Sequence, residues 1–214
     1  MSASTRVAII GAGNVGGGLG IRLSQCGLAV KFGVKPGSDV KALLAQCKDA
    51  SATAPEEAAV WGEVVFLALP ANVAVDLARS LAASLRGKVV VDCNNPLTWQ
   101  EGPVWAPPAE GSLAQAIAKA APGARVVKGF NTFGAEFHKE PGRAGVPAQV
   151  FLAADDAEAK KLVTEVAKQA GFDPVDAGPL RNASVLENLA MLWIHLATVG
   201  GRGRDFTFVT ARRP

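Results

Sequence analysis

Three glycines near the start of the chain have the spacing of a phosphate-binding turn. The apolar run at residues 6–10 leads directly into Gly11-Ala12-Gly13-Asn14-Val15-Gly16, and a segment of helical length follows. In such a turn the first glycine permits a tight bend, the second lets the backbone approach a pyrophosphate, and the third lets the helix pack on the strand. The free N–H groups of the helix N-terminus face the phosphates. The pattern predicts dinucleotide binding by these six residues; the alternative is a purely structural glycine turn.

The residues after the second expected strand distinguish NAD from NADP. A carboxylate at that strand end would bind the ribose 2′-hydroxyl of NAD. This chain has no acid there before Asp39, whereas Lys35 would attract a 2′-phosphate and Ser38 could donate a hydrogen bond to it. We therefore predict NADP as the cofactor, with Lys35 and Ser38 among its ligands. The alternative for Lys35 is an ordinary solvated lysine.

Neutral residues stand where the later strands are expected to end. In open α/β sheets the ligand lies beyond the carboxyl ends of the strands. Leu69, Pro70 and Ala71 are predicted to line the nicotinamide, and Asn94 to bind the cofactor. Asn131 and Thr132 are predicted to bind the substrate. The alternative for both asparagines is that they satisfy the backbone of turns.

Few side chains in the chain can transfer a proton near neutral pH. There is no tyrosine and there are only two histidines. His195 is expected in a core or an interface and His138 in a surface loop, while Lys128 remains a candidate at a strand end. A carbonyl reductase needs a positioned general acid, whereas a flavin or deazaflavin ring accepts a hydride with little acid–base help. We therefore assign no catalytic residue and favour an acceptor of the second kind.

Short apolar runs alternate with alanine-rich segments of helical length. Runs that are apolar at nearly every position are typical of parallel strands buried on both faces. Strands are expected at residues 6–10, 28–34, 64–69, 88–92, 125–130, 149–153 and 172–175, and helices at 14–26, 38–47, 73–85, 112–120 and 157–170. The alternation predicts an α/β fold, a Rossmann-type doubly wound, mostly parallel sheet with a small C-terminal helical piece.

Two further segments complete the predicted organisation. Residues 94–111 contain four prolines and two tryptophans and are expected to form a loop. Residues 181–199 are expected to be helical, and the second half of that helix is apolar on nearly every side, which favours burial against a second subunit. We expect an NADP-binding domain at residues 1–180 and a C-terminal, dimer-forming helical segment at 181–214.

Composition argues against several other classes of protein. The net charge of +3 is too small to indicate nucleic-acid binding, and no apolar run is long enough to cross a bilayer. The three cysteines form no CxxC pair, so neither a metal site nor a disulfide framework is predicted. The first residues do not resemble a signal peptide, and a cytoplasmic location is expected.

Taken together, these motifs resemble the NADPH-dependent deazaflavin reductases, that is, the coenzyme F420:NADP oxidoreductases and their bacterial relatives. The sequence is also similar to the N-terminal part of the STEAP metalloreductases. The resemblance covers nearly the whole chain, and its marks are residues 11–16, 68–70, 127–132, 151–156, 176–182 and 186–187. It departs from the archetypal members at Val34 and Lys35, where those members pair a serine with an arginine.

The resemblance implies a homodimer in which a hydride passes directly between nicotinamide and coenzyme F420 or a flavin, with no essential acid or base. It places the pyrophosphate on residues 11–16, the 2′-phosphate on Lys35 and the nicotinamide beside Leu69, Pro70 and Ala71. Quinones and ferric chelates are alternative acceptors. An NADP-binding sensor without catalysis is an alternative of another class. A β-hydroxyacid dehydrogenase would need a long helical C-terminal domain, and too few residues follow position 180 to build one.

Overall fold

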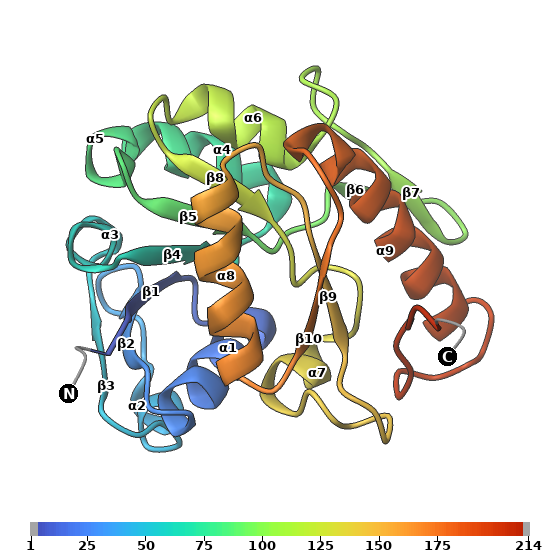
Figure 1. Cartoon of the computed structure of the whole chain (residues 1–214), viewed down its shortest axis with the longest axis horizontal. Coiled ribbons are helices and arrows are strands. Elements are labelled where there is room, and N and C mark those ends of the chain that lie inside the picture. Colours follow the sequence, from blue (N-terminus) through green and yellow to red (C-terminus); the bar gives the residue numbers. More distant parts are fainter. Residues whose placement is uncertain (1–3, 212–214) are drawn as a thin grey trace.

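The structure, a computed structural model, describes residues 4–211 and centres on a six-stranded parallel sheet (Figure 1). The strand order is β3-β2-β1-β4-β5-β8, and every neighbouring pair is parallel. The strands are β1 (Arg6–Ile10), β2 (Ala29–Gly33), β3 (Ala50–Thr53), β4 (Val64–Leu67), β5 (Val89–Asp92) and β8 (Arg125–Lys128). This order confirms the predicted doubly wound, Rossmann-type sheet, in which the direction of winding reverses between β1 and β4.

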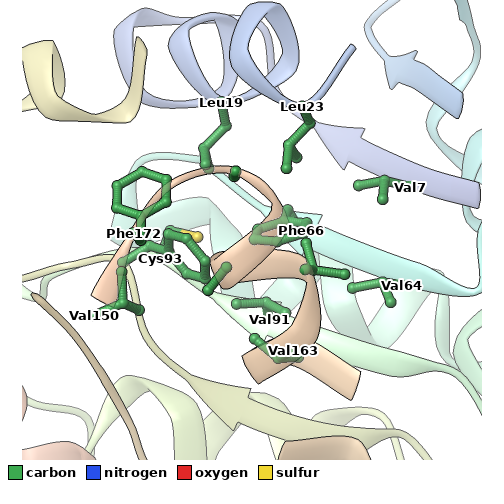
Figure 2. Packing of buried hydrophobic residues seen from close by; sticks show 14 of the residues in the cluster. Val7, Leu19, Leu23, Val64, Phe66, Val91, Cys93, Val150, Val163 and Phe172 are labelled. Atoms are coloured by element: carbon green, nitrogen blue, oxygen red, sulfur yellow. The ribbon is translucent and has the colours of Figure 1, made fainter. Parts of the chain in front are cut away.

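Helices cover both faces of the sheet, so the strands are buried on both sides, as their uniformly apolar sequences predict. One core lies under α1 and α8 and the other under α3, α4, α5 and α6. Leu19 and Leu23 of α1 point toward Phe66 of β4 in the first core (Figure 2). The helices are α1 (Asn14–Gln25), α2 (Lys41–Leu44), α3 (Pro55–Trp61), α4 (Ala71–Ser80), α5 (Ala82–Leu85), α6 (Leu113–Ala120), α7 (Ala135–Lys139), α8 (Ala157–Gln169) and α9 (Ala183–Ala197).

Local sequence explains several of the helix ends. Ser112 caps α6 by accepting a hydrogen bond from the backbone of Gln115, and Asp156 caps α8 in the same way from Ala159. Pro55 occupies the first turn of α3, where its missing N–H removes no helical bond. These caps fix the points at which the chain leaves the sheet and turns back along it.

The structure departs from the sequence expectations in several places. The run at 149–153 is not in the main sheet: β9 (Gln149–Leu152) pairs with β10 (Asp173–Asp176) and meets β8 through a single antiparallel bridge. The expected loop 94–111 contains the hairpin of β6 (Leu97–Trp99) and β7 (Pro103–Trp105). Strand β3 and helices α3 and α7 were not predicted, α2 is shorter than residues 38–47, and residues 73–85 lie in two helices.

The backbone turns sharply just after β8. Phe130 has a φ of +60°, a left-handed conformation that turns the chain out of the strand direction. The chain then runs through α7 before β9 begins at Gln149.

The C-terminal part continues through a short 3₁₀ helix (Leu180–Asn182) into α9, which packs beside the β6–β7 hairpin (Figure 1). The two terminal stretches of the predicted 1–180 and 181–214 regions, residues 1–3 and 212–214, lie outside the described residues. Within residues 4–211, none of the helices has the length and apolar character needed to cross a membrane.

Candidate functional site

The three glycines of the 11–16 turn have different surroundings. Gly11 has a φ of +106°, and a Cβ atom there would lie 2.2 Å from the carbonyl oxygen of Ala68. A Cβ on Gly16 would lie 2.0 Å from the carbonyl oxygen of Gly11. Packing therefore requires glycine at both positions. Gly13 is exposed, has an ordinary φ of −75°, and a Cβ there would meet nothing within 4 Å.

The open space at Gly13 is a cradle that a side chain would partly fill. It lies at the N-terminus of the 12-residue helix α1, at the point where the winding of the sheet reverses. This is the position at which open α/β sheets bind the phosphates of a nucleotide. The described residues thus fit a dinucleotide here, with Ala12 and Asn14 beside the same space.

A cavity of about 320 Å³ lies beyond the end of β2 and is lined by Lys35 and Ser38. Both residues are exposed, and no carboxylate lines this cavity. Asp39 accepts a hydrogen bond from the backbone of Lys41 at 3.1 Å and lies outside the lining. The cavity therefore has a cation and a hydroxyl but no acid, which suits a phosphate group on an adenosine ribose.

At the end of β4, Leu69 and Ala71 are half-buried and Pro70 is exposed. The backbone N–H of Leu69 donates to Asn94 Oδ1 at 2.7 Å. Asn94 in turn donates through Nδ2 to Asp92 Oδ1 at 2.8 Å. The Asn94 amide therefore fixes the neighbouring strand end, with one Nδ2 hydrogen left over.

Lys128, which the sequence left as a candidate proton donor, is fully buried and belongs to an ion cluster. Its Nζ lies 2.8 Å from Asp92 Oδ2 and 3.4 Å from Glu187 Oε1, and it also donates to the carbonyl oxygen of Asn94. All three ionisable side chains are completely buried. Lys128 is thus a structural cation and does not face a ligand.

Glu187 extends the same cluster to two other elements. Its Oε2 accepts from Trp105 Nε1 at 3.0 Å, and its Oε1 accepts from the backbone N–H of Leu113 at 2.9 Å. Burial raises the pKa of Glu187, against the lowering effect of Lys128. One carboxylate on α9 therefore holds the hairpin, the start of α6 and the ends of β5 and β8 together.

Asn131 and Thr132 follow β8 and are both buried. Asn131 Nδ2 donates to Asn95 Oδ1 at 2.9 Å and to the carbonyl oxygen of Leu186 at 3.1 Å. Among the described residues, no donor reaches Asn131 Oδ1, although that oxygen is buried. Both amide hydrogens are committed, so Asn131 can only accept a hydrogen bond from a ligand.

The structure places His138 differently from its prediction and His195 outside the core of this chain. His138 is in α7 and not in a surface loop; it is buried, and its Nε2 lies 2.9 Å from the carbonyl oxygen of Phe130. Burial lowers the pKa of His138 to about 4. His195 is exposed on α9 and not in the core of this chain.

Sequence reasoning missed the partners of Lys128 and the cations of a cleft beside the glycine turn. Asp92 and Glu187 lie on elements far from Lys128 in the sequence, so no local spacing pointed to them. The cleft is lined by Lys139, Arg143 and Arg204, which come from α7, the loop after it and the segment after α9. No motif contains these three residues.

Known proteins resemble this chain over most of its length. The sequence model of the family described as NADP oxidoreductase, coenzyme F420-dependent, matches residues 6–96. A crystal structure from Arthrobacter sp. FB24, of a protein provisionally named an F420-dependent NADP-reductase, is 30% identical, with a TM-score of 0.86 over 96% of this chain and 99% of that one.

Two curated proteins show the breadth of the similarity. The F420-dependent NADP reductase of Methanothermobacter marburgensis is 27% identical over 212 residues, covering 89% of this chain and 92% of that protein. The metalloreductase STEAP2 of Mus musculus is 29% identical over 185 residues, which are 86% of this chain. The chain spans only 36% of the length of that metalloreductase.

Proposed function

Since this chain belongs to the family of coenzyme F420-dependent NADP oxidoreductases, we propose that it transfers a hydride between NADP(H) and a deazaflavin or flavin-like acceptor. The observation that carries the proposal is the open cradle at Gly13 beside an acid-free cavity holding Lys35 and Ser38. Such a site accepts a dinucleotide with a 2′-phosphate. No buried acid or base of the described residues faces it, in keeping with an acceptor that needs none.

Different residues along the carboxyl edge of the sheet bind different parts of the cofactor and the acceptor. The backbone of residues 11–16, including Ala12, Asn14 and Val15, holds the pyrophosphate, and Lys35 and Ser38 hold the 2′-phosphate. Leu69, Pro70 and Ala71 form an apolar wall for the nicotinamide, and Asn94 orients that wall through its bond to the Leu69 N–H. Asn131 and Thr132 contact the acceptor.

Bound NADPH would supply the hydride, and this chain supplies its position. The Asp92–Asn94–Leu69 chain of hydrogen bonds fixes the strand end against which the nicotinamide packs. Among residues 4–211, Asn131 Oδ1 receives no hydrogen bond, and it can only act as an acceptor. None of these groups has to gain or lose a proton during transfer.

The direct test is oxidation of NADPH by the pure protein with coenzyme F420, FMN, a quinone and a ferric chelate offered in parallel. Turnover with the deazaflavin or the flavin supports the proposal. Turnover with the quinone or the chelate alone assigns a different acceptor. Tight NADPH binding without turnover of any acceptor contradicts the proposal and favours a non-catalytic sensor.

The cofactor assignment has its own test in two variants. Lys35→Glu is expected to weaken NADPH binding by about tenfold or more while leaving NADH binding near its original strength, because only NADPH carries the 2′-phosphate. Gly13→Val is expected to block both nucleotides. The control is Lys161→Glu, which makes the same charge change at an exposed position of α8. Unchanged NADPH affinity in Lys35→Glu contradicts the assignment of Lys35.

We also propose that the protein is a cytoplasmic homodimer and that residues 181–214 form much of the dimer contact. The outer side of α9 exposes Val185 and Leu192, which lie seven residues apart and so share one side of the helix, and Val199 is exposed just beyond its end. Light scattering at several concentrations measures the mass. A monomer at all concentrations contradicts the dimer, and Leu192→Glu is expected to dissociate it.

A further inference from the structure

A cleft of about 710 Å³ opens beside the glycine turn, between α1, α2, α7 and the segment after α9. Ala12, Gly13 and Asn14 form its inner end, and Gly17 and Ile21 continue it along the outer side of α1. A pyrophosphate at the turn would occupy only this inner end. The volume is in the range of small-molecule sites, so most of the cleft is free for a second ligand.

The wall opposite α1 is rich in hydrogen-bond donors. Arg204 donates through Nε and Nη2 to both oxygens of Glu136, at 2.7 and 3.1 Å. Arg143 donates through Nε to Asp205 and through Nη1 to Glu140. A guanidinium has five N–H groups, so each arginine keeps three donors beyond these ion pairs. The pairs balance the arginine charges but do not use up their donors.

Lys139 is the remaining cation of the cleft, and among the described residues its side chain meets no carboxylate. Its Nζ donates to the neutral Oε1 of Gln46 at 3.1 Å. Lys139 therefore contributes a positive charge that the carboxylates lining the cleft, Glu136 and Glu140, do not neutralise by direct pairing. An anion entering the cleft would find this charge together with the free guanidinium donors.

We propose that this cleft binds an anionic substituent of the hydride acceptor, a phosphate or a carboxylate, with Lys139 as its principal contact. The proposal rests on the hydride transfer proposed above, because it identifies the cleft with part of the acceptor site. Ala135 and Glu136, in the cleft wall, follow Asn131 and Thr132 closely in the chain. Thr132 and Ala135 are three residues apart and so lie within about 11 Å of each other, which brings the cleft within reach of a substituent on a ring bound at Thr132.

The C-terminal segment takes part in this site because it carries Arg204. The indole Nε1 of Trp193 donates to the carbonyl oxygen of Phe206 at 2.9 Å, and the two rings stack with centroids 5.2 Å apart. The guanidinium of Arg204 lies 5.5 Å from the centroid of the Trp193 ring. These contacts hold the segment against α9 and α7, so the cationic wall is built before a ligand arrives.

FMN and riboflavin are the probes, since they share one ring system and differ by a phosphate. The wild-type protein is expected to have a lower KM for FMN than for riboflavin at low ionic strength, and added salt should remove the difference. Lys139→Glu is expected to raise the KM for FMN by about tenfold and to leave the KM for riboflavin near its wild-type value. Lys161→Glu on α8 should change neither.

Each outcome decides between this proposal and the proposed function. Reduction of both flavins with equal KM, or an equal effect of Lys139→Glu on both, overturns the anion site while hydride transfer stands. If neither flavin is reduced, the proposed hydride transfer to flavins fails. The quenching of flavin fluorescence on binding then measures the two affinities and tests the anion site by itself. FMN binding that is no tighter than riboflavin binding, or that survives Lys139→Glu unchanged, then overturns it.

Discussion

Replacing Lys128 with methionine tests the buried ion cluster directly. Methionine keeps a long apolar side chain but removes the ammonium group between Asp92 Oδ2, at 2.8 Å, and Glu187 Oε1, at 3.4 Å. Because all three side chains are fully buried, neither carboxylate can turn to solvent for compensation. The variant therefore holds two buried carboxylates with no cation between them.

Breaking a buried ion pair by removing one partner costs about 3–5 kcal/mol. Domains are usually stable by only about 5–15 kcal/mol, so a large part of the stability is lost. For a domain of this size each kcal/mol corresponds to about 2–4 °C in Tm, and Lys128→Met is expected to melt about 6–20 °C lower. Urea unfolding followed by tryptophan fluorescence measures the free-energy difference at an unchanged m-value.

The pH dependence gives an independent check. Burial already raises the pKa of Glu187 in the folded protein, and Lys128 opposes that rise. A raised folded-state pKa contributes stability that is present below the unfolded value and is lost as pH rises through the folded value. Without Lys128 this pKa rises further. The destabilisation by Lys128→Met should therefore shrink as the solution is made more acidic.

A second variant separates charge from packing. Lys128→Met combined with Glu187→Gln removes one of the stranded charges and should recover part of the loss, even though the single amide oxygen of the new glutamine cannot replace both carboxylate oxygens as acceptors. A loss below about 1 kcal/mol for Lys128→Met, with no dependence on pH, would refute the reasoning, since it would mean that the carboxylates are not held as buried charges.

Two further predictions concern stability. Because burial lowers the pKa of His138 from 6.5 to about 4, the free energy of unfolding should fall by up to about 3 kcal/mol as pH drops between these values; His138→Gln should lose this slope, and His195→Gln, on the exposed histidine, should keep it. A Cβ on Gly20 would lie 2.0 Å from Cζ of buried Phe32, so Gly20→Ala should cost about 1–3 kcal/mol in a urea titration. A Cβ on Gly17 would find only ordinary contacts, the nearest at 3.4 Å, so Gly17→Ala should be neutral or stabilising by up to about 1 kcal/mol; equal effects of the two alanines would contradict the packing argument.

The main sheet could be predicted because its strands are short apolar runs buried on both faces. Strand β3, with the sequence Ala50-Ser51-Ala52-Thr53, lies at the sheet edge and lacks such a run, so it left no signal. The run at 149–153 has the composition of a sheet strand, but it pairs with β10 and meets β8 only at one bridge. Composition indicates that a strand forms but not which neighbour it pairs with.

The glycine turn could be read from sequence because six consecutive residues carry it. Lys35, the proposed ligand of the 2′-phosphate, likewise follows β2 closely in the chain. The Lys128 cluster is different, since Asp92 is 36 residues away and the Leu113–Glu187 bond spans 74 residues. A buried lysine and a lysine facing a ligand look the same in sequence, and only the tertiary partners distinguish them.

The C-terminal segment shows why this distinction matters for function. Its helix α9 supplies Glu187, which binds Lys128, Trp105 and the start of α6, and the stretch after it supplies Arg204 to the cleft. The glycine turn is built from residues close together in the chain, whereas the cleft beside it is completed by Arg204, which follows α9. Under the proposed function, sequence change in that segment would alter the contacts of the acceptor while the glycine turn stays the same.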